Sequence, residues 1–112
     1  MYKAIEYMKA NFWNIIFVVV SDDLKWPKTV LSVRSNESIY FHEEGSTPEV
    51  DLAVMTSCDH VIQTVGAFGW WTGFLPGGIS MYYPHLGRIG SPGEARYIYT
   101  DFFPPSWFPI DV

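Results

Sequence analysis

The hydrophobic positions of the first 80 residues follow two alternating patterns, a helical spacing and short continuous apolar runs. Ile5, Met8 and Phe12 lie three and four residues apart, which predicts an amphipathic helix over residues 2–12. The run at 15–20 is wholly apolar and largely β-branched, which is typical of a strand covered on both faces in a parallel sheet. The chain therefore starts with a helix followed by a buried strand.

The same alternation continues as far as Tyr83. Further strands are expected at 38–41, 60–63 and 80–83, and helices after the N-cap signal at 21–23, at 47–58 and at 67–75. The helix at 47–58 has its own start signal, and its apolar positions Val50, Ala53, Val54 and Met55 are expected to form one face. Strands alternating with helices imply right-handed crossovers, so the sequence predicts an α/β fold with a parallel, doubly wound, Rossmann-like sheet.

Beyond Pro84 no period remains, and the tail is rich in aromatic residues, glycine and proline. Its segment 102–107 is expected to pack back on the domain as a cover. With 112 residues, 48% of them apolar, the chain can bury one core, and its formal net charge of −5 argues against a nucleic-acid partner. Its single cysteine, Cys58, excludes an intrachain disulfide framework and a cysteine-based zinc cluster.

Three loops qualify as a ligand site, because ligands of open α/β sheets bind beyond the carboxyl ends of the strands. These loops span 21–23, 45–51 and 64–69. In the third, the free N–H groups of Ala67, Phe68 and Gly69 could bind a diphosphate after the turn at Thr64 and Gly66. A tight turn that serves only helix packing is at least as common a reason for such a sequence.

Most other candidate residues also have two interpretations. Asp51 could complement a helix dipole or accept hydrogen bonds from guanine, and the pair Asp22 and Asp23 could share acid and base roles or cap a helix. His60 is a structural histidine or a ligand, and Trp70 packs in the domain or stacks on a sugar. Asn36 begins a glycosylation triplet. No cluster has the spacing of metal ligands.

One long segment closely resembles a known motif. It runs from Asp51 through Cys58-Asp59-His60 to Trp71 and ends in the turn Leu75-Pro76-Gly77-Gly78. This resembles the C-terminal motif of the α-1,2-fucosyltransferases, glycosyltransferase family 11. The upstream segment 17–26 resembles the sequence segment that follows a helix in members of this family. The resemblance covers about residues 2–83, and its motifs are long and specific.

The resemblance implies a fold, a donor and a reaction. Residues 1–112 would form the C-terminal, nucleotide-sugar-binding half of a two-Rossmann GT-B enzyme that is incomplete on its N-terminal side. GDP-β-L-fucose would donate fucose, with inversion, to the 2-hydroxyl of a terminal galactose, without a metal or another cofactor. In the family pattern Asp51 would hold guanine, and the diphosphate would be bound by Thr64, Gly66, Ala67, Phe68 and Gly69.

The sequence also departs from the family pattern. The family's arginine motif, which neutralises the leaving diphosphate, has no counterpart here, because the chain contains no adjacent arginine pair. The catalytic residues are therefore not identified, and we expect no turnover by this chain alone. The alternatives are a remnant that at most binds GDP-fucose and an unrelated sugar-binding α/β protein. A type II membrane anchor and placement in the Golgi lumen are expected only from the family, upstream of these residues.

Overall fold

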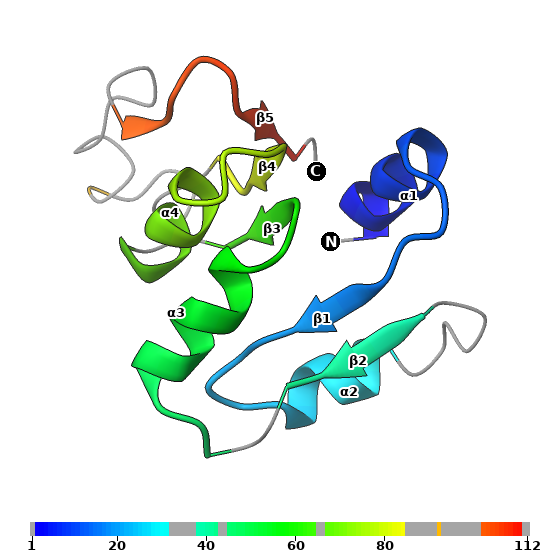
Figure 1. Cartoon of the computed structure of the whole chain (residues 1–112), viewed down its shortest axis with the longest axis vertical. Helices are drawn as coiled ribbons and strands as arrows, with labels where there is room; N and C mark the ends of the chain where they lie inside the picture. Colours follow the sequence, from blue (N-terminus) through cyan, green and yellow to red (C-terminus); the bar gives the residue numbers. More distant parts are fainter. Residues whose placement is uncertain are drawn as a thin grey trace.

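The computed structural model describes residues 2–31, 38–42, 45–64, 67–84, 92 and 102–110. Figure 1 shows helices and strands alternating along most of the chain. The elements are α1 (Tyr2–Asn11), β1 (Phe17–Val19), α2 (Lys25–Leu31), β2 (Ile39–Phe41), α3 (Pro48–Thr56), β3 (Val61–Gln63), α4 (Ala67–Phe74), β4 (Ser80–Tyr82) and β5 (Phe108–Pro109). This order confirms the predicted α/β alternation, with strands one or more residues shorter than expected.

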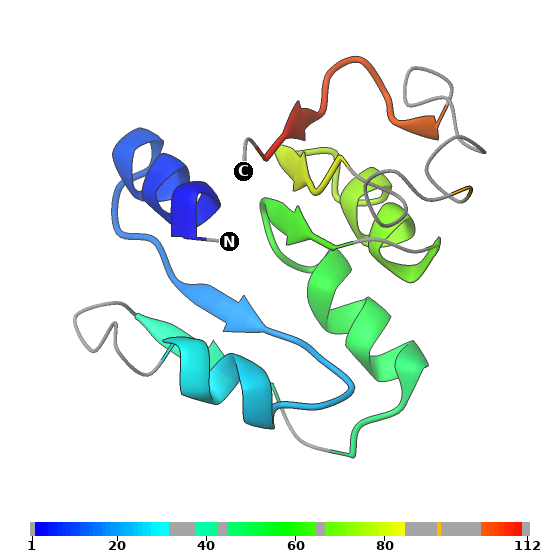
Figure 2. The ribbon, with the colours of Figure 1, turned by 180° about the vertical axis from the view of Figure 1, so that it is seen from behind.

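Among the described residues all the strand pairs are parallel, but the strands form two sheets in place of the single sheet that was predicted. One sheet pairs β1 with β2, and the other has the order β3-β4-β5. Figures 1 and 2 show β1 and β3 as the neighbouring strands of the two sheets. Among the described residues no strand hydrogen bond joins β1 to β3, so each has one edge without a neighbouring strand.

The expectation of a strand at 15–20 covered on both faces was wrong. Only Phe17–Val19 is extended with sheet pairing. Ile16 is 61% exposed and Val18 is 38% exposed. The physical reason is that a two-stranded sheet gives β1 a single neighbour, so its second edge and part of its side-chain surface have no described cover.

The start of α2 differs slightly from its sequence signal. The helix begins at Lys25, whose N–H donates to Oδ1 of Asp23 over 2.9 Å. Ser21 donates its hydroxyl to the carbonyl oxygen of Asp23 over 3.0 Å. Pro27 lies in the first turn, where a missing N–H costs nothing, and its ring is buried.

Helix α3 begins as its sequence predicts but buries a different face. The side chain of Thr47 accepts from the N–H of Val50 over 3.4 Å, and Pro48 occupies the first turn. The predicted apolar face of Val50, Ala53, Val54 and Met55 is only partly covered, because Val50 is 48% exposed and Ala53 is also exposed, whereas Val54 and Met55 are half-buried. Asp51 is the buried residue of this helix, since its carboxylate has a partner on the loop after β2.

The aromatic tail covers the second sheet, as expected, and adds a strand that the sequence did not predict. Strand β5 pairs in parallel with β4, and Ile110 donates its N–H to the carbonyl oxygen of Tyr82 over 2.7 Å. Phe103 and Trp107 are buried beside this sheet. The core cluster consists of Ala4, Met8, Met81 and Ile110, so α1 and the tail share one apolar centre.

The turn before β4 requires both of its glycines. Gly77 has a φ of +74°, in the left-handed region that favours glycine. Gly78 lies so close to Asp59 that a Cβ would overlap the Asp59 carbonyl oxygen and come within 2.8 Å of Nδ1 of His60. The Leu-Pro-Gly-Gly segment therefore brings the chain tightly past the start of β3.

Candidate functional site

A cavity of about 560 Å³ lies along β1 and β3 and extends past the residues where these strands end. Its lining at this end includes Ser21 and Asp22 after β1, Asp51 in α3, Thr64 after β3 and Phe68 in α4. Residues from all three predicted loops therefore meet at one cavity. Its volume falls within the range of small-molecule sites, roughly 300–1,000 Å³.

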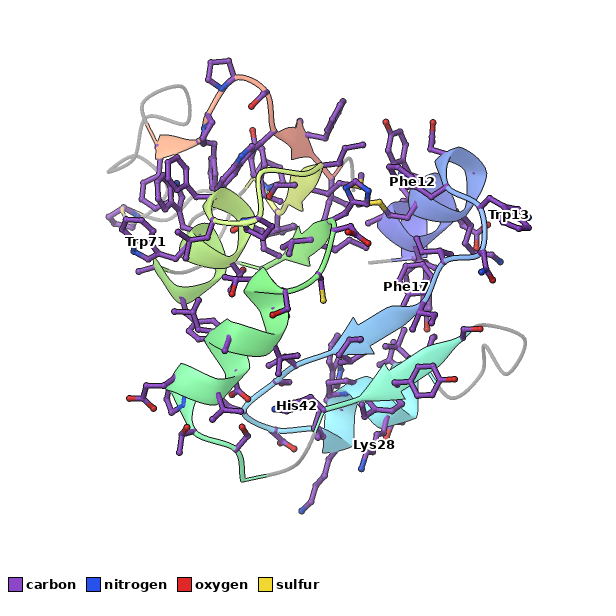
Figure 3. The ribbon with its side chains drawn as sticks, viewed as in Figure 1. Phe12, Trp13, Phe17, Lys28, His42 and Trp71 are labelled. Carbon is purple, nitrogen blue, oxygen red and sulfur yellow. The ribbon has the colours of Figure 1, made fainter. Side chains whose placement is uncertain are left out.

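The carboxylate of Asp51 is held by a histidine that the sequence analysis missed. Asp51 is 8% exposed, and its Oδ1 lies 3.3 Å from Nε2 of His42. The same Nε2 is 3.1 Å from Oγ of Ser46. Figure 3 shows His42 at the end of β2, on the side of α3. The position of His42 directly after an expected strand was the signal that could have identified it, because parallel strands direct their carboxyl ends to the site.

The first turn of α4 borders the cavity through Phe68 and Gly69. A Cβ on Gly69 would lie only 2.9 Å from the carbonyl oxygen of Thr64, so this glycine is required for close packing of α4 on the end of β3. Helix packing alone therefore explains the glycine at position 69, which was one of the two interpretations of this loop. Ala67 is exposed and does not line the cavity, and Gly66 lies outside the described residues.

A buried polar pair joins the wall of the cavity to β4 and was also missed. Gln63 is 3% exposed and Ser80 is 1% exposed, and Nε2 of Gln63 donates to Oγ of Ser80 over 2.7 Å. Gly73 packs directly on this pair, since a Cβ there would overlap both side chains. Thr72 is fully buried and donates its hydroxyl to the carbonyl oxygen of Gly69 over 2.6 Å. A polar residue ending an apolar strand was the available signal for Gln63.

The two aspartates after β1 have different surroundings. Asp22 lines the cavity, whereas Asp23 does not. Because the carboxylate of Asp23 accepts from the N–H of Lys25, it is used in the start of α2. The structure therefore places one exposed carboxylate at the cavity and does not bring the two acids together there.

His60 and Trp70 both have packing partners. Nδ1 of His60 accepts a hydrogen bond from the N–H of Ile79 over 2.9 Å, so that nitrogen carries no proton. Its ring stacks on Phe12 with centroids 4.1 Å apart, and it lines the inner part of the cavity. Trp70 does not line the cavity, and its Nε1 donates to the carbonyl oxygen of Phe102 over 2.8 Å, which ties α4 to the tail.

Cys58 lines the cavity as a protonated thiol. Burial raises the pKa of its thiol, and the neighbouring carboxylate of Asp59 raises that pKa further. Its Sγ donates to the carbonyl oxygen of Val54 over 3.4 Å. A thiol with a raised pKa is a poor nucleophile at neutral pH.

The described lining of the cavity combines apolar side chains with two acids and several neutral polar side chains, and it contains no lysine or arginine. Across the part of the chain that the structure describes, no group of three or more His, Cys, Asp or Glu side chains could hold a metal ion. No helix in those residues is both long and apolar enough to cross a membrane. The glycosylation candidate Asn36 lies outside the described residues.

Comparison with known proteins gives consistent matches. The model of the family described as glycosyl transferase family 11 matches residues 1–110. The chain is 28% identical over 109 residues to galactoside 2-alpha-L-fucosyltransferase Sec1 of Mus musculus and 30% identical over 110 residues to SEC1 of Bos taurus. It is 28% identical over 112 residues to galactoside alpha-(1,2)-fucosyltransferase 2 of Sus scrofa.

These matches cover nearly the whole chain but a minor part of each relative. They span 96% of this chain for the mouse and cattle proteins and 98% for the pig protein. The chain spans only 30% to 33% of the length of these relatives. No solved structure matches it. Since the family match extends over residues 1–110, the resemblance predicted from the motif at 51–78 is confirmed, and the chain belongs to glycosyltransferase family 11.

Proposed function

We propose that this chain forms the nucleotide-sugar-binding part of a galactoside 2-α-L-fucosyltransferase. In this reaction fucose passes from GDP-β-L-fucose to the 2-hydroxyl of a terminal galactose, with inversion at the sugar carbon. The observation that carries the proposal is that Asp51 and the first turn of α4 border one cavity at the carboxyl ends of β1 and β3. Family membership supplies the reaction class.

Asp51 is the proposed guanine ligand. A carboxylate can accept hydrogen bonds from both N1–H and the N2 amino group of guanine. The pairing of Oδ1 with His42 limits rotation of the carboxylate, and only 8% of the residue is exposed. A fixed, largely desolvated acceptor favours guanine over adenine, since adenine lacks that pair of neighbouring donors.

The diphosphate is proposed to bind the start of α4. The N–H groups of Ala67, Phe68 and Gly69 are the first three of the helix and have no acceptor within it. The hydroxyl of Thr64 and the backbone of Gly66 complete the proposed set. Such a site stabilises a diphosphate through N–H groups and the helix dipole without any side-chain cation.

The leaving diphosphate needs more positive charge than this cavity provides. Asp22 and Asp51 are acids, and the described lining holds no lysine or arginine. A missing cation at a developing anion costs several kcal/mol of transition-state stabilisation. We therefore propose that the chain binds donor but needs an arginine from a further part of the enzyme for turnover.

The remaining features of the proposal follow from the family. The complete enzyme would have the two-domain GT-B arrangement, use no metal, and be anchored as a type II protein facing the Golgi lumen. Its galactose-terminated acceptor would bind mainly to the part that these residues do not include.

A second candidate function is donor binding without catalysis. The acidic lining favours it, because a catalytically incomplete remnant would keep the guanine and backbone contacts and lack the cation. A third possibility, a sugar-binding α/β protein unrelated to fucose, is opposed by the family match over residues 1–110. Glycan binding without nucleotide would favour it.

Calorimetric titration of the folded chain with GDP, GDP-fucose and ADP tests the proposal. We expect GDP and GDP-fucose to bind and ADP to bind at least about tenfold more weakly, a difference of roughly 1.4 kcal/mol. Equal affinity for GDP and ADP would remove the guanine assignment. No binding by a chain with a cooperative unfolding transition would remove the donor site.

A further inference from the structure

The inner part of the cavity is a slot between two strand edges. Its lining includes the consecutive residues 17–20, which are β1 and the residue after it, and 61–64, which are β3 and the residue after it. Successive side chains of a strand point to opposite faces, so a cavity that contacts four residues in a row runs along the strand's edge. Both strands have their other edge occupied, β1 by β2 and β3 by β4.

The backbone directions of both strands agree with this slot. The N–H of Phe17 in β1 donates to the carbonyl oxygen of Ser38, just before β2. The N–H of Val61 in β3 donates to the carbonyl oxygen of Ile79, just before β4. In a parallel ladder alternate residues of a strand bond to the same neighbour. The N–H and C=O groups of Val18 and Ile62 therefore point into the slot, where no described strand accepts them.

The order of elements shows which strand the slot fits. Helices α2 and α4 each connect two paired parallel strands and α3 connects the two sheets, whereas α1 leads into β1 with no strand before it among the described residues. In a doubly wound sheet the first strand lies in the middle, in the order 3-2-1-4-5-6. If β1 to β5 are strands 2 to 6 of this order, the vacant position falls between β1 and β3, where the slot lies.

We propose that one extended apolar strand, supplied by polypeptide outside this sequence, inserts between β1 and β3. It runs parallel to both and joins the two sheets into one six-stranded sheet, β2-β1-insert-β3-β4-β5. The relatives contain enough further polypeptide to supply such a strand, since this chain spans only about 30% of their length. The proposal goes beyond the donor site, because it concerns the inner slot and holds whichever ligand occupies the outer end.

The chemistry of the slot specifies the inserted residues. Its walls away from the carboxyl ends are formed largely by apolar side chains, among them Ile5, Met8, Ile15, Leu31 and Ile39. A central strand of a parallel sheet is covered on both faces and reads as a continuous apolar run. The insert should therefore be about five β-branched or aliphatic residues without proline, since proline cannot donate to the ladder.

Amide hydrogen exchange of the full chain tests the proposal with the peptide acetyl-Lys-Val-Ile-Val-Ile-Val-Lys-amide as the probe. At ten times its Kd, the peptide should slow exchange at Val18 and Ile62 by about tenfold. Ile39 and Phe41 are the matched internal controls, because their N–H groups point to the outer edge of β2. A peptide of the same sequence and charge with all five central residues N-methylated has no donor on either edge and should give no slowing.

Each other result of the exchange experiment has its own interpretation. Slowing at Ile39 and Phe41 without slowing at Val18 and Ile62 would place the peptide on the outer edge and overturn the proposal. So would equal slowing by the N-methylated peptide, or no slowing at all. Protection of Val18 and Ile62 in the chain alone, with a dimer in sedimentation analysis, would assign the slot to a second copy. Because no readout involves nucleotide, a failure of GDP binding leaves this test unaffected.

Discussion

Oδ1 of Asp51 lies 3.3 Å from Nε2 of His42, so a single pair joins the start of α3 to the end of β2. Both side chains are largely buried, with 12% and 18% of their surfaces exposed. An acid placed here for the helix dipole alone would have no need of this partner. The pair gives Asp51 a fixed orientation at the cavity, which is the property that the proposed guanine contact requires.

Replacing Asp51 by alanine should weaken GDP binding by about 30-fold, or roughly 2 kcal/mol, because two hydrogen bonds to a charged acceptor are lost. Calorimetric titration of the Asp51→Ala chain measures the change. Glu49→Ala is the matched control, since Glu49 is an exposed acid in the same helix turn. Equal losses in the two variants would show that the negative charge of the turn, and no specific contact, affects binding.

His42 should act on GDP through Asp51. We expect His42→Ala to weaken GDP binding less than Asp51→Ala does, because the carboxylate remains but can rotate. In a double-mutant cycle the effect of His42→Ala should largely vanish once Asp51 is alanine, with a coupling energy of about 0.5–3 kcal/mol. Strictly additive losses would mean that His42 contacts the ligand independently.

The sequence predicted the order of the elements better than their burial. Helical spacing at Ile5 and Met8 and the Thr47-Pro48 start signal identify α1 and α3, because these signals are local. The split into two sheets could not be predicted in this way, since strand pairing depends on contacts distant in sequence. Strand β5 was missed for the same reason, because Phe108–Pro109 has no strand periodicity and pairs only where β4 offers an edge.

The candidate site was predicted in part. Placing loops at the carboxyl ends of strands correctly brought Asp22, Asp51 and Thr64 to one cavity. Two side-chain contacts were not found, because those of His42 with Asp51 and of Gln63 with Ser80 join segments that periodicity treats separately. The roles proposed for the predicted residues in donor binding stay predictions.

Gly73 should be intolerant of a side chain although it lies in a helix. Alanine there would gain up to about 1 kcal/mol of helix propensity, yet its Cβ overlaps Gln63 and Ser80, and overpacking costs about 1–3 kcal/mol. We expect Gly73→Ala to lower the urea midpoint. A midpoint that is unchanged or raised, as helix propensity alone would give, would contradict tight packing at Gly73.

The buried pair Gln63 and Ser80 should show a large penalty when only one partner is removed. Ser80→Ala leaves the amide of Gln63 without its acceptor and should cost about 1–3 kcal/mol of unfolding free energy. Adding Gln63→Leu removes the unsatisfied donor, so the double variant should be less destabilised than the sum of the single variants. Urea unfolding of all four proteins provides the comparison, and an additive result would show that the hydrogen bond contributes nothing beyond its two side chains.

Cys58 should react slowly with thiol reagents at neutral pH. Burial, and then the carboxylate of Asp59, raise the pKa of the thiol, so the reactive thiolate becomes common only at a higher pH than for a free cysteine. The alkylation rate with iodoacetamide should therefore keep rising beyond the pH at which a model thiol levels off. Asp59→Asn removes the smaller cause and should shift this profile toward lower pH by only part of the difference. A profile identical to that of the model thiol would mean that the thiol is as hydrated as in the unfolded chain, which its hydrogen bond to Val54 opposes.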